Sequence, residues 1–93
     1  MSETQTVRTK RRRATAFDEI RILEQEGRHG WHLVDFGPWR LDLEASDHPW
    51  QHLRLAWPSP AVLQALSESG WTLVGRWAWW AYLKRPTPPA ESD

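Results

Sequence analysis

One motif of five residues occurs twice in this chain, at a spacing of 40 positions. Gly30-Trp31-His32-Leu33-Val34 returns as Gly70-Trp71-Thr72-Leu73-Val74. Further pairs align at the same spacing on both sides of the motif: Ile22-Leu23 with Val62-Leu63, Phe17 with Trp57, and Trp39 with Trp79. A spacing of this length is typical of a duplicated supersecondary unit. The fold is therefore expected to contain two copies of one small unit.

The first unit combines a helix with strands. A helix is expected over about 16–28, because Thr15 and Asp18 have capping-box spacing and Gly30 stands where a glycine ends a helix. The residues after it alternate, with Trp39, Leu41 and Leu43 on one face and charged side chains on the other, which is typical of a half-exposed antiparallel strand. The expected strands of this unit span 7–10, 31–36 and 39–44.

The second unit follows the same order. Ser59 is the expected N-cap of a helix over about 60–69, Pro60 is its first residue, and Gly70 ends it. The apolar side chains expected to face inward from this helix are Val62, Leu63 and Leu66. The expected strands of this unit span 52–57, 71–77 and 78–84.

Each unit thus has the order strand–helix–strand–strand. Two such βαββ repeats are predicted to form one mostly antiparallel sheet with two short helices on one face, which is an α+β fold. A single two-repeat domain is expected over 15–85, with repeat 1 at about 7–44 and repeat 2 at about 52–85. Residues 1–14 are expected to be a basic flexible tail or an edge strand, and 86–93 a disordered tail.

Composition limits the class of protein. A chain of 93 residues buries only about 60–65% of its unfolded surface, so its eight tryptophans are expected to supply much of the core. No cysteine is present, which excludes disulfides and is compatible with the expected location in a reducing cytoplasm. No apolar run approaches the roughly 18 residues of a membrane span, and no apolar stretch follows the basic N-terminus as in a secretory signal.

The two Gly-Trp-x-Leu-Val hairpins resemble a bacterial family of uncharacterised domains whose members carry this helix-and-hairpin unit once or twice. The resemblance covers about residues 15–85 and rests on Glu26 to Phe36, Leu53 to Trp57 and Leu66 to Lys84. Two-unit members are often encoded beside PadR-type transcriptional regulators. The resemblance implies an accessory, sensory or regulatory role and no catalytic residues. This chain lacks the membrane-spanning tail that some members append.

The residues that could carry chemistry form no recognisable catalytic or metal site. The histidine pairs His29/His32 and His48/His52 straddle turns and strand starts, whereas i,i+4 rings converge on a metal when they lie on a helix. No serine lies in a Gly-x-Ser-x-Gly motif, and no glycine-rich phosphate loop is present. The chain is therefore predicted not to be an enzyme and to use no metal or cofactor.

The strongest electrostatic feature lies near the N-terminus. Residues 1–13 contain five basic residues against Glu3 alone. A run of this kind binds phosphates by releasing counterions, and exposed indoles stack on unpaired bases. The candidate nucleic-acid contacts are Lys10, Arg11, Arg12 and Arg13. Since the whole chain has a net charge of zero, the rest of it is acidic, which disfavours a broad basic groove.

The final hairpin carries aromatic residues on both faces. Alternation sends Trp79, Ala81 and Leu83 to one face, and Trp80, Tyr82 and Lys84 to the other. Because two helices on one face cannot cover both, an aromatic, helix-free face is expected, and such a patch marks a partner, ligand or self-interface. The expected contact residues are Val34, Phe36, Arg40, Arg54, Arg76, Trp80 and Tyr82.

The preferred functional hypothesis is a non-catalytic interaction or regulatory module that uses this face to form a homodimer or to dock a protein partner. One alternative is a small-ligand sensor with an aromatic pocket between the sheet and residues 44–52. The other is a nucleic-acid accessory protein that binds through the basic N-terminal residues.

Overall fold

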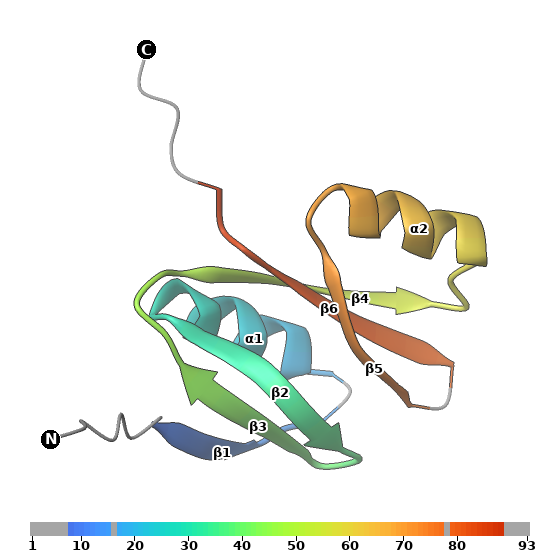
Figure 1. Cartoon of the computed structure of the whole chain (residues 1–93). Coiled ribbons are helices and arrows are strands. Elements are labelled where there is room, and N and C mark those ends of the chain that lie inside the picture. The colour runs from blue at the N-terminus through green and yellow to red at the C-terminus, as the bar shows by residue number, and fades with distance from the viewer. Residues whose placement is uncertain (1–7, 16, 78, 89–93) are drawn as a thin grey trace, which may run out of the picture.

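The computed structural model describes residues 8–15, 17–77 and 79–88. Within these ranges the chain forms six strands and two helices in the predicted order (Figure 1). Their bounds are β1 (Thr9–Arg13), α1 (Glu19–Arg28), β2 (Trp31–Gly37), β3 (Arg40–Ala45), β4 (Trp50–Ala56), α2 (Pro60–Glu68), β5 (Thr72–Trp77) and β6 (Trp80–Pro86). The α+β class and its two βαββ repeats are confirmed.

The prediction of one continuous sheet is wrong, because the three strands of each repeat form a separate sheet. The first sheet, sheet A, has the order β1-β3-β2, and the second, sheet B, has the order β4-β6-β5. Both are antiparallel, and the last strand of each repeat is the central one. The outer strands of each sheet are therefore parallel to each other, and the helix between them is a crossover connection.

The two helices do not share a face of one sheet. Helix α1 packs against both β2 and β4, so it lies between sheet A and the edge of sheet B (Figure 1). Helix α2 packs against β5 and lies on the far side of sheet B (Figure 1). As a result α1 is covered from two sides, whereas α2 forms an outer layer with no buried residue.

Irregular features recur at equivalent places in the repeats. Each helix is followed by a glycine with a left-handed backbone, Gly30 at φ 90° and Gly70 at φ 94°. Each following strand carries a register shift of one residue against the central strand, between Leu33 and Asp35 and between Leu73 and Gly75. All these pairs keep the 40-residue spacing, so the two units share backbone detail as well as sequence.

The alignment of Phe17 with Trp57 is wrong. The N–H of Ala14 donates to the carbonyl of Trp39 at 3.1 Å, and the N–H of Trp57 donates to the carbonyl of Trp79 at 2.9 Å. Ala14 is therefore the structural equivalent of Trp57, since Trp39 and Trp79 are equivalent. Equivalent positions are thus 43 residues apart in the first strands of the repeats but 40 apart from the helix ends onward, which a fixed spacing of 40 does not reveal.

Both helix starts agree with local rules. The hydroxyl of Ser59 accepts a hydrogen bond from the N–H of Val62 at 3.2 Å, as an N-cap does. At α1 the carboxylate of Asp18 reaches back to the N–H of Thr15 at 2.7 Å, which is half of a capping box. The helix begins at Glu19, later than expected, because Asp18 rather than Thr15 is its N-cap.

The core lies in repeat 1. Its fully buried aliphatic side chains come from α1 and sheet A: Leu23, Leu33, Leu41 and Leu43. Sheet B adds Tyr82, which belongs to the same cluster. The expectation that Val62 faces inward is wrong, since 45% of its surface is exposed. The main cluster of buried side chains thus lies around α1, while Ala81 and Leu83 of β6 are buried outside this cluster.

The predicted termini are partly described. Residues 9–13 form an edge strand, so the alternative of a tail does not apply to them. At the other end β6 extends to Pro86, and the N–H of Thr87 donates to the carbonyl of Pro49 at 2.9 Å. The expected disordered tail therefore cannot begin at residue 86. Residues 1–7 and 89–93 lie outside the described ranges.

Candidate functional site

The face of sheet A that points away from α1 is not the expected aromatic face. Its central strand presents Arg40 and Asp42, which form an ion pair at 3.2 Å. Arg40 also pairs with Asp35 at 3.2 Å. Of the residues predicted to bind a partner, Val34 lies exposed at the β2 bulge and Arg40 is held in this ion-pair network. The face is therefore mainly charged.

Tyr82 was expected on an open face but is only 4% exposed. Its ring packs against Phe36 with centroids 4.5 Å apart, and its hydroxyl donates to the carboxylate of Glu19 at the start of α1. Burial raises the pKa of Tyr82 well above its usual range, and the Glu19 carboxylate adds to the effect. Tyr82 and Phe36 are thus part of the joint between the repeats, so neither offers a free contact surface in this structure.

Arg54 and Trp80 belong to the same joint. The guanidinium of Arg54 pairs with Glu19 at 2.6 Å and lies 4.3 Å from the centroid of the Trp80 ring. The indole of Trp80 packs partly against the core. Alternation placed Trp80 and Tyr82 correctly on one face of β6, but that face meets α1 and β2 because sheet B folds over them.

Most of the basic side chains of strand β1 are engaged in ion pairs with neighbouring elements. Lys10 pairs with Glu26 at 2.6 Å, Arg12 pairs with the same carboxylate, and Arg11 pairs with Asp42 at 2.8 Å. Burial would raise the pKa of Glu26, but the hydrogen bonds and charges of Lys10 and Arg12 outweigh it and hold that pKa below its usual value. These ion pairs hold β1 against α1 and β3, so three of the four predicted nucleic-acid contacts already have carboxylate partners, while Arg13 forms no ion pair with the described residues.

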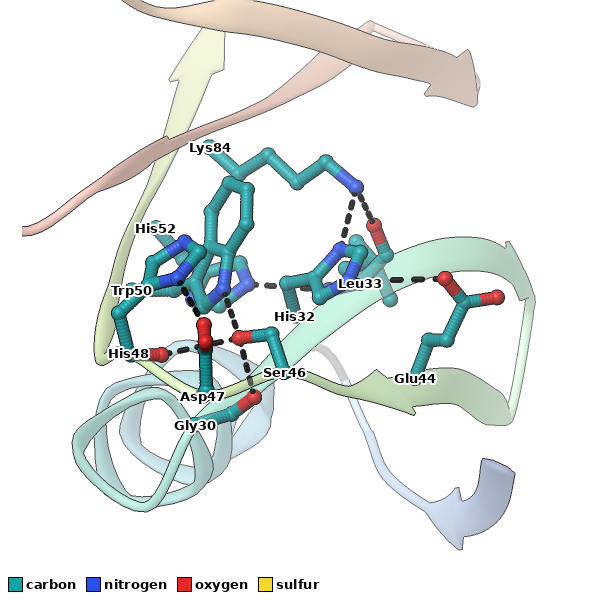
Figure 2. Close-up of polar contacts among 10 residues, drawn as sticks. All are labelled: Gly30, His32, Leu33, Glu44, Ser46, Asp47, His48, Trp50, His52 and Lys84. Carbon is teal, nitrogen blue, oxygen red and sulfur yellow. Dashed lines mark hydrogen bonds and ion pairs between the residues drawn. The ribbon is translucent and has the colours of Figure 1, made fainter. Parts of the chain in front are cut away.

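A clamp of polar side chains joins sheet B to the edge of sheet A (Figure 2). The N–H of Leu33 donates to Nε2 of His52 at 3.1 Å, and the ammonium of Lys84 donates to the Leu33 carbonyl at 2.8 Å. Lys84 also donates to Nδ1 of His32 at 2.7 Å. The backbone of an edge residue in β2 is therefore satisfied by side chains of β4 and β6.

The hydrogen bonds of the clamp determine which ring nitrogen of His52 carries the proton. Because Nε2 of His52 accepts from Leu33, the neutral ring carries its proton on Nδ1, which makes no well-formed hydrogen bond to the described residues. Burial lowers the pKa of His52 to about 4, and the charge of Lys84 acts in the same direction. The backbone of Leu23 lies near this histidine and weakly opposes the lowering of its pKa. Burial also lowers the pKa values of His32 and Lys84. The hydrogen bonds of this joint therefore require both His52 and His32 to be neutral.

Trp50 closes the clamp beside the linker between the repeats. Its ring stacks on His32 with centroids 4.4 Å apart and lies 5.0 Å from the ring of His48 (Figure 2). Its indole N–H donates to the hydroxyl of Ser46 at 2.6 Å. Within the described ranges no group of three or more histidine, aspartate or glutamate side chains could hold a metal ion. The arrangement is a structural joint.

A second aromatic group lies at the opposite end of sheet B and is open to solvent. We call it the tryptophan hollow, a depression of about 170 Å³ lined by Trp57, Pro58, Arg76, Trp79 and Trp80. The rings of Trp57 and Trp79 are nearly parallel, at 12°, with centroids 6.4 Å apart. Trp79 meets Trp80 at 6.1 Å and 44°. The hollow presents flat indole faces from the ends of β4 and β6, and Arg76 of β5 lies beside them.

Trp57 has an unusual backbone conformation. Its φ is 50°, in the left-handed region that a bulky side chain rarely adopts, and it is the one non-glycine residue of the described chain with positive φ. The side chain is 79% exposed. A strained residue that gains little burial is a candidate for function, because strain of this kind persists where the surroundings hold it.

Arg76 supplies the charge of the hollow. Its guanidinium forms no ion pair and no hydrogen bond with the described residues, whereas Arg40 and Arg54 both form ion pairs. A cation beside exposed indoles recognises an anionic group next to an apolar one. Of the predicted contact residues, Arg76 and Trp80 are therefore brought together, while Val34 and Arg40 lie on sheet A.

A larger hollow of about 480 Å³ lies where α1 crosses the edge of β4. Its lining residues are Glu24, Arg28, Trp50, Gln51, His52, Trp71 and Thr87. Arg85 flanks it, with its guanidinium 4.7 Å from the centroid of the Trp71 ring and a hydrogen bond to Gln51 at 2.7 Å. Trp50, Gln51 and His52 come from or adjoin the linker where an aromatic pocket was expected.

Sequence reasoning missed Trp57 and Trp79 as site residues. Trp57 was expected at the end of the strand over 52–57, and Trp79 on the face of the final hairpin opposite the expected contact residues Trp80 and Tyr82. The dipeptide Trp57-Pro58 before an N-cap serine was the available signal, because the strand must turn there into α2.

None of the helices in the described ranges is both long enough and apolar enough to span a membrane. No protein-family model matches this sequence, and the comparisons with curated proteins and with solved structures also return no match.

Proposed function

We propose that this protein is a non-catalytic interaction module that docks an extended segment of a protein partner in the tryptophan hollow. The observation that carries the proposal is the combination of two exposed, nearly parallel indoles with an arginine that has no partner among the described residues. Interfaces are enriched in tryptophan and arginine at their energetic centres. The accessory or regulatory role implied by the family resemblance agrees with a docking module.

The shape of the hollow favours an extended segment. Polyproline II segments dock on surfaces lined by aromatic side chains, since such segments are already extended and lose little entropy on binding. Trp57 and Pro58 follow β4, and Trp79 precedes β6, so two neighbouring strands carry the contact surface. A rigid support of this kind keeps the indoles in place before the partner arrives.

The test uses labelled ten-residue peptides and the full chain. A panel would contain proline-rich acidic, proline-rich basic and proline-free acidic peptides, with binding followed by fluorescence anisotropy. Saturable binding of a proline-rich acidic peptide is expected, weakened on the order of tenfold by W57A. The matched control is W39A, because Trp39 is the exposed repeat-1 equivalent of Trp79 and lines no hollow described above. Equal affinities for W57A and the wild type would overturn the proposal.

The 480 Å³ hollow supports a second candidate function, the binding of a small ligand. Its volume is within the range of ligand pockets, and it combines indole faces with Glu24, Arg28 and Gln51. A thermal-shift screen of small metabolites should identify compounds that stabilise the wild type but not the W71A variant. A screen without any such compound would remove this candidate and leave the docking proposal unaffected.

A further inference from the structure

We infer that the occupant of the tryptophan hollow is the proline-rich segment Pro86-Thr87-Pro88-Pro89 of a second copy of this chain, followed by its acidic residues Glu91 and Asp93. The inference rests on the proposed function and names its partner. It combines three observations: the chemistry of the hollow, the composition of this segment, and the distance between the two within one chain.

The segment matches the hollow chemically. Three of its four residues are proline, and acidic residues follow within a few positions. Proline rings pack on indole faces in polyproline II recognition. At the rise of about 3.1 Å per residue of such a helix, Glu91 would lie about 6 Å beyond Pro89, within reach of a cation at the rim. Arg76 is that cation, and it is unpaired among the described residues.

The segment cannot serve its own hollow. In the register of β4 and β6, Ala56 faces Trp80 at the end that carries the hollow, and Trp50 faces Pro86 at the other end. Six residue steps along a strand place Pro86 about 20 Å from Trp80. The hydrogen bond from Thr87 to Pro49 fixes the segment at that far end. Pro88 and Pro89 follow at once, so the prolines meet a hollow only in another molecule.

Part of the segment is accessible for such a contact. Pro86 and Pro88 are exposed. Since the hollow and the segment are different surfaces at opposite ends of sheet B, the contact is heterologous: one copy gives the segment and another gives the hollow. Self-association through this contact needs both surfaces and is lost when either one is removed.

The experiment measures binding of a labelled peptide of residues 85–93 to the full chain carrying P88A and P89A, so that the host's own prolines do not compete. Saturable binding is expected. W57A and R76E should each weaken it on the order of tenfold, and W39A should leave it unchanged. A peptide with E91K should bind the R76E host more tightly than the unchanged peptide does, because the charge pair is restored with reversed sign. Circular dichroism of each variant confirms that the host is folded.

Light scattering of the unsubstituted chain over a range of concentrations gives the second readout. The average mass should rise with concentration, and both W57A and the P88A/P89A pair should suppress the rise. If the tail peptide fails to bind but another proline-rich acidic peptide binds in a manner sensitive to W57A, the inference is overturned and the proposed function stands. If no peptide binds in that manner, both are overturned.

A third outcome of the light-scattering experiment would also overturn the inference. If association survives P88A/P89A but is lost in W57A, two hollows meet each other, and the inference about the segment is wrong.

Discussion

The two repeats have the same order of elements but opposite environments. Helix α1 lies between sheet A and β4 and has five buried residues, two of them glutamates, whereas α2 has none. The glutamates Glu19 and Glu26 are paired with cations of sheet B and sheet A. A helix that is covered on two sides must have a partner for each polar group, while a helix at the surface need not.

The two repeats also differ in the large apolar side chains that they expose. Repeat 1 supplies most of the main core cluster, and its exposed large apolar side chains are Phe17, Val34 and Trp39. Repeat 2 leaves several large apolar side chains more than 40% exposed: Trp57, Val62, Leu73, Trp77 and Trp79. One copy of the duplicated unit therefore carries most of the core, and the other exposes more large apolar side chains. Three pairs of substitutions at equivalent positions, and one pH titration of a residue found only in repeat 2, test this division.

The largest difference is expected for the leucine at the centre of each helix. Leu23 is 1% exposed, so Leu23→Ala should lower the free energy of unfolding by about 3–4 kcal/mol through lost burial and a cavity. Leu63 is half-buried, and Leu63→Ala should lower it by about 1 kcal/mol. Urea unfolding measures both. Equal losses would mean that α2 is covered as well as α1.

The next pair concerns the residue at which α1 meets β4. A Cβ at Gly27 would overlap the carbonyl oxygen of Trp50, so the backbone would have to move. Gly27→Ala should therefore destabilise the protein by about 2–3 kcal/mol, although alanine is the better helix former. Ser67 is its equivalent and is exposed, so Ser67→Ala should change stability by less than about 0.5 kcal/mol. A stabilising Gly27→Ala would contradict the close contact.

The clamp has a titratable histidine in repeat 2 and none at the equivalent position of repeat 1, so a pH titration of stability tests its contribution. His52 pairs across the sheet with Lys84, and its equivalent facing Glu44 in repeat 1 is Thr9. The unfolded chain protonates this histidine near pH 6.5, but the folded chain does so only near pH 4. The unfolded state therefore binds more protons in this window, and stability falls as pH falls.

From pH 7 to pH 5 the loss from His52 should be about 2 kcal/mol. His32, whose pKa burial also lowers, adds to it in the same direction. His52→Gln should flatten the dependence, since a glutamine oxygen can accept from Leu33 without titrating. Unfolding free energies at several pH values measure the slope. An unchanged slope in the variant would show that His52 is not the titrating group.

The smallest change in stability is expected from exchanging alanine and glycine at the end of the first strand, and its sign should differ between the two repeats. Trp57 and Ala14 are equivalent, but Trp57 has positive φ and Ala14 is a buried core residue. At position 57 glycine should be more stable than alanine by about 1 kcal/mol, because it adopts φ 50° without strain. At position 14 glycine should be less stable than alanine by about the same amount. Thermal unfolding of W57G, W57A and A14G makes the comparison, and W57A exceeding W57G would refute the strain.

Much of the local structure was predictable because it follows from short-range sterics. Gly30 and Gly70 end their helices with positive φ, as glycine does at that position. Ser59 caps α2 through its hydroxyl, as its neighbour Pro60 indicated. Alternation placed Trp80 and Tyr82 on one face of β6 correctly. The interpretation of that face was wrong, because alternation does not say what lies opposite a face.

The candidate site was predictable only in part. Arg76 and Trp80 were expected contact residues and do line the hollow, but in the joint Tyr82 is buried and Phe36 is partly buried against it. The basic residues of 10–13 were expected to be available for nucleic acid, yet most are paired with carboxylates that are distant in sequence. Long-range ion pairs depend on which elements meet, and a pattern of neighbouring residues carries no information about that.

The sequence alone determined that the chain consists of two βαββ units and where their helices end, since these features depend on each residue's own backbone preferences and on its immediate neighbours. The tertiary structure decided that the units keep separate sheets and that α1 is enclosed while α2 is not. It also decided which tryptophans remain open to a partner. Burial is a property of what packs against a segment, and two segments of similar sequence differ in burial when only one of them lies between both sheets.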